Sequence, residues 1–171
     1  MVEKARDYTL AVTGCIICSS KRPQMNILKE VIASEGGNPR NSVVSHRFKT
    51  SIMNAALING VSGHTLYFDD DYREGALHSS VAVFPAVFAI GECNRVGGKD
   101  FLLSFKLGLE VMIHLGESVL GKSYYQEFHP TGICGLFGAA ASCANVMGLD
   151  TLRTKYAIGI SGSVSRLAGV S

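Results

Sequence analysis

The chain has 171 residues, which is enough for one domain with a packed core and too few for two ordinary domains. Apolar residues make up 47% of it and charged residues 18%, and the mean hydropathy is +0.22. Because this is apolar for a soluble monomer, we expect part of the surface to meet another chain or a missing part of the same one. The formal charge of +2 comes without long runs of either sign, which argues against a nucleic-acid partner and leaves steering of a small anion open.

Most of the chain has the apolar spacing of helices. Seven segments show it, at residues 3–19, 24–34, 50–62, 81–94, 100–120, from 130 onward and from 150 onward. Residues 81–94 are almost wholly apolar, which predicts a helix buried on all sides with Pro85 in its first turns. The segment after Pro130 is rich in glycine and alanine, so neighbouring backbones can pack closely against it. Only residues 42–45 suggest a strand, and we predict an all-α fold in a single domain over residues 1–171.

Signals for secretion or membrane insertion do not occur in the sequence. No run reaches the roughly 18 apolar residues of a membrane span, and the first ten residues lack the basic and then apolar pattern of a secretory signal. The five cysteines fall mostly within apolar helical patterns, and Cys15 and Cys18 are interpreted as two core thiols one helical turn apart. We therefore expect reduced cysteines, no membrane partner and a cytoplasmic protein, or a mitochondrial-matrix protein if a targeting segment is missing.

The first candidate site is an acidic loop that leads to a histidine. Asp69, Asp70 and Asp71 precede His78 by a short polar stretch, and His64 lies just upstream. The spacing supports a functional site and a solvated acidic loop with one helix cap about equally. Adjacent aspartates in an extended loop point to opposite sides, so at most two of the three could share a metal ion with His78. We therefore favour a site without a metal.

The second candidate site is EFHPTG, residues 127–132. His129 precedes a predicted helix N-terminus, whose first amides have no intrahelical partner and can hold an anion. A histidine there could transfer a proton to or from a substrate whose carboxylate those amides bind. The alternative is that His129 only caps the helix, and taken alone this alternative is the better supported. His46 and His114 are assigned no function.

Two stretches together, NAALINGVSGHTLYFDDDYREGALHSSVAVFPAVFAIGE and FHPTGICGLFGAAASCANVMGLD, resemble the MmgE/PrpD family. This family includes 2-methylcitrate dehydratase, cis-aconitate decarboxylase and iminodisuccinate epimerase. The resemblance covers essentially the whole chain. It implies a helical bundle like the family's large helical domain, an active site between that domain and a smaller α/β lid that is absent here, and a homodimer or larger homo-oligomer.

The resemblance also implies roles for individual residues, matched by position. Catalytic roles fall on His78, His129, Asp69 and Asp70. Substrate-binding roles fall on Asp71, His64, Thr131 and Gly132. We expect the two catalytic histidines to face one cavity, with one of the two catalytic aspartates at its rim. No metal or other cofactor is implied.

Three positions of the loop depart from the family pattern. Tyr67 stands where relatives often have an aspartate, Asp71 where they often have a threonine, and Ser79 where a proline usually follows the histidine. The loss of an acid at position 67 changes the usual proton-transfer arrangement. Either Asp71 compensates for it or the reaction differs.

The activity implied by the resemblance is proton abstraction next to a carboxylate of a small polycarboxylate, followed by loss of hydroxide or carbon dioxide or by reprotonation. We expect a fragment of a hydro-lyase similar to 2-methylcitrate dehydratase, with activity like that of cis-aconitate decarboxylase or iminodisuccinate epimerase as the alternative. An inactive helical interaction partner and a metal-dependent hydrolase stay open as other classes. Because the leading helix, a later motif with lysine and histidine, and the lid are expected to be missing, we predict that the chain alone self-associates and is inactive.

Overall fold

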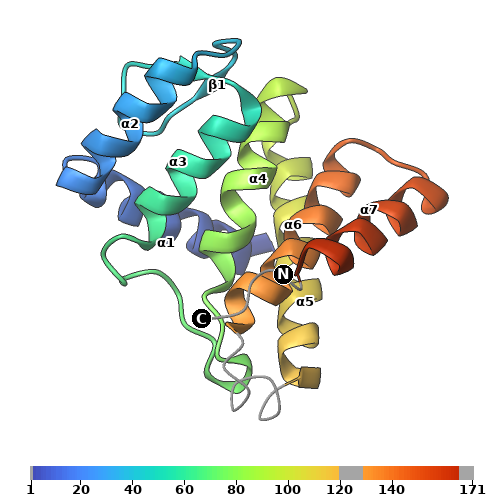
Figure 1. Cartoon of the computed structure of the whole chain (residues 1–171). Coiled ribbons are helices and arrows are strands. Elements are labelled where there is room, and N and C mark those ends of the chain that lie inside the picture. Colours follow the sequence, from blue (N-terminus) through green and yellow to red (C-terminus); the bar gives the residue numbers. More distant parts are fainter. Residues whose placement is uncertain (1, 120–128, 166–171) are drawn as a thin grey trace.

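The computed structural model describes residues 2–119 and 129–165, and helices dominate this part of the chain (Figure 1). They are α1 (Val2–Ser19), α2 (Pro23–Glu35), α3 (Ile52–His64), α4 (Ser79–Cys93), α5 (Gly98–Val119), α6 (Pro130–Val146) and α7 (Thr151–Val164), with a 3-10 turn, η1, at Arg73–Gly75. The all-α prediction is confirmed. The ends of two predicted helices, at residue 120 and beyond residue 165, lie outside the described residues.

A two-stranded sheet of minimal size links α2 to α3. Strand β1 (Asn41–Ser42) pairs antiparallel with β2 (Lys49–Thr50). The predicted strand at 42–45 is therefore wrong in its extent. The chain turns instead, because the His46 N–H donates to the Val43 carbonyl at 3.1 Å and Ser45 has a left-handed φ of 65°. The alternation of apolar residues gave no sign of β2, which is only two residues long.

Helix α4 lies in the middle of the molecule and packs against α3, α5 and α6 (Figure 1). Its side chains Val83, Phe84 and Val87 are buried in the main core, as the apolar sequence predicted. Phe84 packs on Phe105 with ring centroids 5.7 Å apart, which ties α4 to α5. The helix begins two residues earlier than predicted, so Pro85 lies inside it and not in its first turn.

Close backbone packing between α5 and α6 depends on two glycines. A Cβ atom at Gly138 would come within 2.6 Å of the Gly108 carbonyl oxygen, and one at Gly108 would meet the Gly138 oxygen at the same distance. No larger residue fits at this crossing without moving a helix. The small residues of α6 therefore have the packing role that the sequence indicated.

The surface carries apolar side chains, most clearly on α7. This helix has no buried residue, and Leu152, Tyr156 and Ile160 are exposed along one stripe. Within the described residues, no helix is long and apolar enough to cross a membrane.

All five cysteines are free, but Cys18 is exposed while Cys15 is buried, so the prediction of two core thiols is wrong for Cys18. In a helix, side chains three residues apart point in directions that differ by about 60°, so Cys15 can face the core while Cys18 faces solvent.

Candidate functional site

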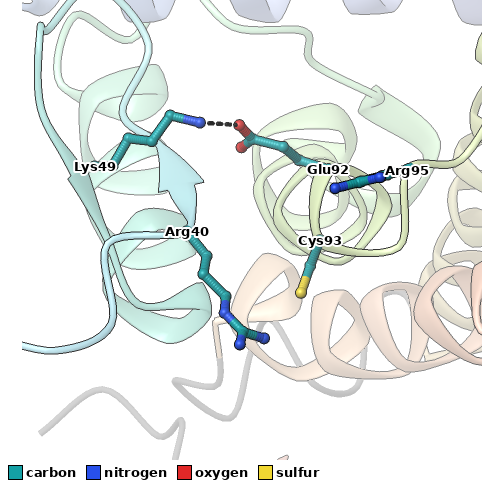
Figure 2. Close-up of a pocket in the computed structure, with 5 residues that line it drawn as sticks. All are labelled: Arg40, Lys49, Glu92, Cys93 and Arg95. Carbon is teal, nitrogen blue, oxygen red and sulfur yellow. Dashed lines mark hydrogen bonds and ion pairs between the residues drawn. The ribbon is translucent and has the colours of Figure 1, made fainter.

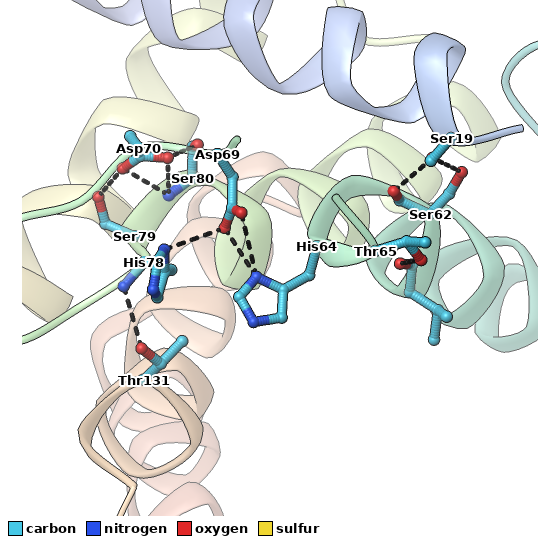
Figure 3. A network of polar contacts seen from close by, with 11 residues as sticks. Ser19, Ser62, His64, Thr65, Asp69, Asp70, His78, Ser79, Ser80 and Thr131 are labelled. Atoms are coloured by element: carbon cyan, nitrogen blue, oxygen red, sulfur yellow. Dashed lines mark hydrogen bonds and ion pairs between the residues drawn. The ribbon is translucent and has the colours of Figure 1, made fainter. Parts of the chain in front are cut away.

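The carboxylate of Asp69 is buried between two imidazoles (Figure 3). His64 Nδ1 lies 2.9 Å from Asp69 Oδ2 and 3.1 Å from Oδ1, and His78 Nδ1 lies 3.3 Å from the same Oδ2. Because an ionised carboxylate can only accept, His64 donates from Nδ1 and a neutral His64 ring keeps its lone pair on Nε2. An imidazole held in this way by a buried carboxylate is suited to accept a proton from a substrate.

A tight turn after α3 brings Asp69 back to His64. His64 is the last residue of the helix, and the Tyr67 N–H donates to its carbonyl at 3.1 Å. Tyr67 has a φ of 54°, a left-handed conformation that is uncommon for a residue with a side chain. Its ring packs on the His64 ring, with centroids 4.8 Å apart, while 76% of the residue stays exposed. Tyr67, at the position where the resemblance implies an aspartate, therefore shapes the turn in this chain.

Asp70 points away from the histidines and holds the start of α4 (Figure 3). It accepts hydrogen bonds from the Ser79 hydroxyl at 2.5 Å, from the Ser80 N–H at 3.1 Å and from the Ser80 hydroxyl. Burial raises the pKa of Asp70, and the hydrogen bonds from the two serines oppose this rise. A carboxylate at a helix N-terminus stabilises the helix, so the structure gives Asp70 a structural contact. Its predicted catalytic role stays a prediction.

Asp71 is exposed, so the three aspartates point in different directions, as the sequence predicted. Within residues 2–119 and 129–165, its side chain makes no hydrogen bond to another side chain or to the backbone. Ser79, at the position where the resemblance implies a proline, is one of the two serines that bind Asp70. Sequence reasoning missed this pairing, although an acid followed nine residues later by Ser-Ser at a helix start is a signal for it.

An open groove of about 380 Å³ lies beside the cluster formed by His64, Asp69 and His78. Four of its lining residues are among those predicted for the site, namely His64, His129, Thr131 and Gly132. The rest of the lining is apolar or small and comes from α3, α4 and α6, namely Gly60, Val61, Val81, Ala82, Gly135, Leu136 and Ala139. The His78 ring lies next to this lining, with its centroid 4.9 Å from that of His64. The two histidines on the groove itself are thus His64 and His129, whereas His78 and His129 were expected from the sequence to face one cavity.

His129 caps α6 through its side chain. Its Nδ1 accepts a hydrogen bond of 3.0 Å from the Gly132 N–H, so a neutral His129 carries its proton on Nε2. The capping role considered for His129 is present in the structure, and it fixes the tautomer of a ring that lines the groove. The two residues that precede it in the motif, Glu127 and Phe128, lie outside the described residues.

A second hollow, of about 470 Å³, lies at the other end of α4 (Figure 2). It is lined by Arg40, Lys49, Glu92, Cys93 and Arg95. Glu92 pairs with Lys49 at 3.2 Å and accepts hydrogen bonds from the Ser42 N–H at 2.7 Å and the Ser42 hydroxyl at 2.6 Å. These contacts fasten the end of α4 to β1. No residue of this hollow was singled out by the sequence.

The fold and the site together define a helical domain in which imidazole and carboxylate groups lie beside an apolar groove. Comparison with family models identifies the domain, since residues 1–167 match the MmgE/PrpD N-terminal domain. The chain belongs to the MmgE/PrpD family. The resemblance noted in the sequence is thereby confirmed.

Curated relatives include enzymes named for one reaction. The chain is 34% identical to cis-aconitate decarboxylase of Mus musculus over 116 residues, which covers 64% of this chain and 23% of that protein. The values for cis-aconitate decarboxylase of Homo sapiens are 33%, 64% and 24%. A cis-aconitate decarboxylase-like protein of Aspergillus oryzae is 25% identical over 169 residues, with 94% of this chain and 35% of that protein covered. The matches thus span about a quarter to a third of the relatives' length.

Proposed function

We propose that this chain supplies part of the active site of a lyase that acts on a small polycarboxylate by proton transfer at a carbon next to a carboxylate. The observation that carries the proposal is the His64–Asp69 pair beside His129 on one groove. The names of the relatives favour decarboxylation of cis-aconitate over the dehydration that the sequence analysis put first. Dehydration of 2-methylcitrate and epimerisation of iminodisuccinate stay as alternatives.

In this proposal His64 transfers the proton at the substrate carbon. Its Nδ1–H is held by the buried Asp69 carboxylate, which leaves Nε2 free to exchange a proton with that carbon. In decarboxylation the bond to the departing carbon dioxide breaks, its electron pair stays with the substrate, and protonated His64 donates a proton to carbon from Nε2; in dehydration or epimerisation neutral His64 first accepts a proton there. The imidazolium that forms is stabilised by the same carboxylate at 2.9 Å. His64 was predicted to bind substrate. Because His64 lines the groove and His78 does not, His64 is better placed than His78 to contact a substrate there. Asp71 is exposed, which argues against its replacing the acid missing at position 67.

His129 is proposed as a hydrogen-bond donor to a substrate oxygen. Its Nδ1 is occupied by the Gly132 N–H, so the proton on Nε2 is the one available for a ligand in the groove. A donor there stabilises the negative charge that develops on a carboxylate oxygen when the substrate loses carbon dioxide or, in the alternative reactions, a proton from the neighbouring carbon. Thr131 lines the same groove and accepts a hydrogen bond from the backbone N–H of His78. It therefore holds the loop before α4 next to the start of α6.

The proposal is tested by assaying the complete gene product with cis-aconitate, following release of carbon dioxide, and with 2-methylcitrate and iminodisuccinate. We expect turnover of cis-aconitate that falls at least about 100-fold in His64→Asn, the size expected for loss of a general acid or base. His114→Asn, an exposed histidine on α5, is the matched control and should keep full activity. Absence of turnover with all three compounds, or full activity in His64→Asn, would contradict the proposal.

A further inference from the structure

The residues around Asp69 have the composition of a transition-metal site. His64, Asp69 and His78 each offer one ligand atom, and these atoms all lie within 4.8 Å of one another. From the sequence, at most two of the three aspartates could share an ion with His78, and a site without a metal was favoured; in the structure Asp70 and Asp71 point elsewhere. The set that the fold assembles has two imidazoles and one carboxylate, which suits zinc, iron(II) and similar ions.

A second observation points to a ligand at the same place. His78 Nδ1 is buried and has no hydrogen-bond partner among the described residues, although it lies 3.3 Å from Asp69 Oδ2. The separation of 3.3 Å is short enough for a hydrogen bond, but the angle at which His78 Nδ1 and Asp69 Oδ2 approach each other does not allow one. A buried nitrogen left in this way is costly unless something else satisfies it. A cation between the nitrogen and the carboxylate would do so.

The distances agree with one ion at the centre of the three groups. Zinc binds imidazole nitrogen at about 2.0–2.1 Å and carboxylate oxygen at about 2.0–2.2 Å, so neighbouring ligand atoms of one ion lie about 3.0–3.5 Å apart. The separations from Asp69 Oδ2 are 2.9 Å to His64 Nδ1 and 3.3 Å to His78 Nδ1. The same range of about 3.0–3.5 Å applies to two nitrogens on one tetrahedral zinc, so ring nitrogens up to 4.8 Å apart have to move closer by at most about 1.8 Å.

Exposure of the rings allows this movement. The side chains of His64 and His78 are 33% and 28% exposed, while that of Asp69 is fully buried. The imidazoles can therefore rotate toward a fixed carboxylate, and solvent can reach the ion and fill its remaining positions. Three protein ligands with one open side are the pattern of zinc sites that exchange a ligand.

We propose that His64, Asp69 and His78 bind one divalent transition-metal ion through the two Nδ1 atoms and the Asp69 carboxylate. Metal on Nδ1 of His64 leaves that ring with one proton, on Nε2, so the ring cannot form the imidazolium through which His64 transfers a proton. Metal binding and proton transfer by His64 therefore exclude each other, and the ion is an inhibitory ligand of this site. Binding itself does not depend on the proposed function, because it requires no substrate.

The test is calorimetric titration of the metal-free 171-residue chain with zinc chloride, repeated with cobalt(II) to follow its visible absorption. We expect one ion per chain, with affinity at least about tenfold weaker in His78→Asn and in His64→Asn, a change of about 1.4 kcal/mol or more. His114→Asn should bind as the parent chain does. Circular dichroism of each variant shows whether its helices are intact.

Three results would overturn the proposal. They are no binding by the parent chain, equal affinity in the parent and both cluster variants, and loss of binding in Cys18→Ser. The last result would place the ion on the exposed thiol instead. If either His64→Asn or His78→Asn fails to fold, the question is still decided by the number of ions bound by the parent chain and by the affinity of the remaining variant.

Discussion

The backbone N–H of His78 donates a hydrogen bond of 3.0 Å to the hydroxyl of Thr131, across 53 residues of sequence. This bond joins the loop that carries the histidine and aspartate cluster to the first turn of α6, which carries His129. The amide of His78 precedes α4 and would otherwise lack a helical partner. One hydroxyl thus holds together the two motifs that the sequence singled out separately.

Replacement of Thr131 by valine should therefore destabilise the chain by about 1 kcal/mol, the usual contribution of one hydrogen bond. Thr131→Ser keeps the hydroxyl and is the matched control. Urea denaturation followed by circular dichroism measures the difference. A Thr131→Val chain as stable as Thr131→Ser would show that the bond contributes nothing to folding.

Asp70 should matter to stability and Asp71 should not. Asp70→Ala removes the acceptor of the Ser79 and Ser80 hydrogen bonds at the start of α4, with an expected loss of about 0.5–2 kcal/mol in the free energy of unfolding. Asp71→Ala changes an exposed residue and should stay within about 0.5 kcal/mol of the parent. Thermal denaturation of the two variants side by side checks this. Equal losses would mean that the capping contact is not what distinguishes them.

The sequence predicted the helices well because their apolar spacing is strong, and it failed where contacts between distant residues decide. The buried α4 and the close packing of α6 at Gly138 follow from composition and small residues, whereas the sequence did not single out its partner on α5, Gly108. The sequence did not show which aspartate would pair with which partner, because that depends on the turn at Tyr67, whose left-handed conformation is unusual for a tyrosine. His64 was in the predicted set, but its contact with Asp69 needed the folded chain.

Glu92 should make folding sensitive to acid. Partial burial raises the pKa of Glu92, but hydrogen bonds from Ser42 and the contact with Lys49 outweigh this, so its pKa lies below the ordinary value of 4.5. A lowered pKa in the folded state means that the contribution to stability is present above about pH 4.5 and is lost as the pH falls through the folded-state pKa. Glu92→Gln should accordingly be less stable than the parent at pH 7, by about 1–3 kcal/mol, and the gap should narrow in acid.

Denaturation curves of the parent and Glu92→Gln between pH 7 and pH 3 measure that gap. Glu35→Gln, at the exposed end of α2, is the control and should follow the parent at every pH. A gap that stays constant or widens as the pH falls would contradict the assignment of Glu92 as the acid-sensitive contact.

The crossing of α5 and α6 should not tolerate a methyl group. Gly108→Ala and Gly138→Ala each place a Cβ atom 2.6 Å from a carbonyl oxygen of the other helix, so each should cost about 1–3 kcal/mol. Gly14→Ala in α1 meets no heavy atom within 4 Å and should instead stabilise the chain by about 0.5–1 kcal/mol, because alanine favours helix. Melting temperatures in opposite directions are expected. If all three substitutions stabilise, the helices do not approach as closely as described.

Self-association is expected to use the stripe on α7. Leu152, Tyr156, Ile160 and Val164 follow each other at intervals of four residues, so they lie on one face of the helix, and all are exposed. Apolar side chains in such a row favour contact with a second copy of the chain.

Sedimentation should show a homodimer or larger species for the parent and a monomer for Ile160→Lys. This substitution removes an apolar contact and places a positive charge in the contact face, where it would lose its contact with water. The helix content of this variant should be unchanged, because the residue packs on nothing in the core. Leu10→Lys, equally exposed on α1, is the control and should leave the dimer intact. A monomeric parent, or dissociation by Leu10→Lys and not by Ile160→Lys, would show that α7 is not the contact face.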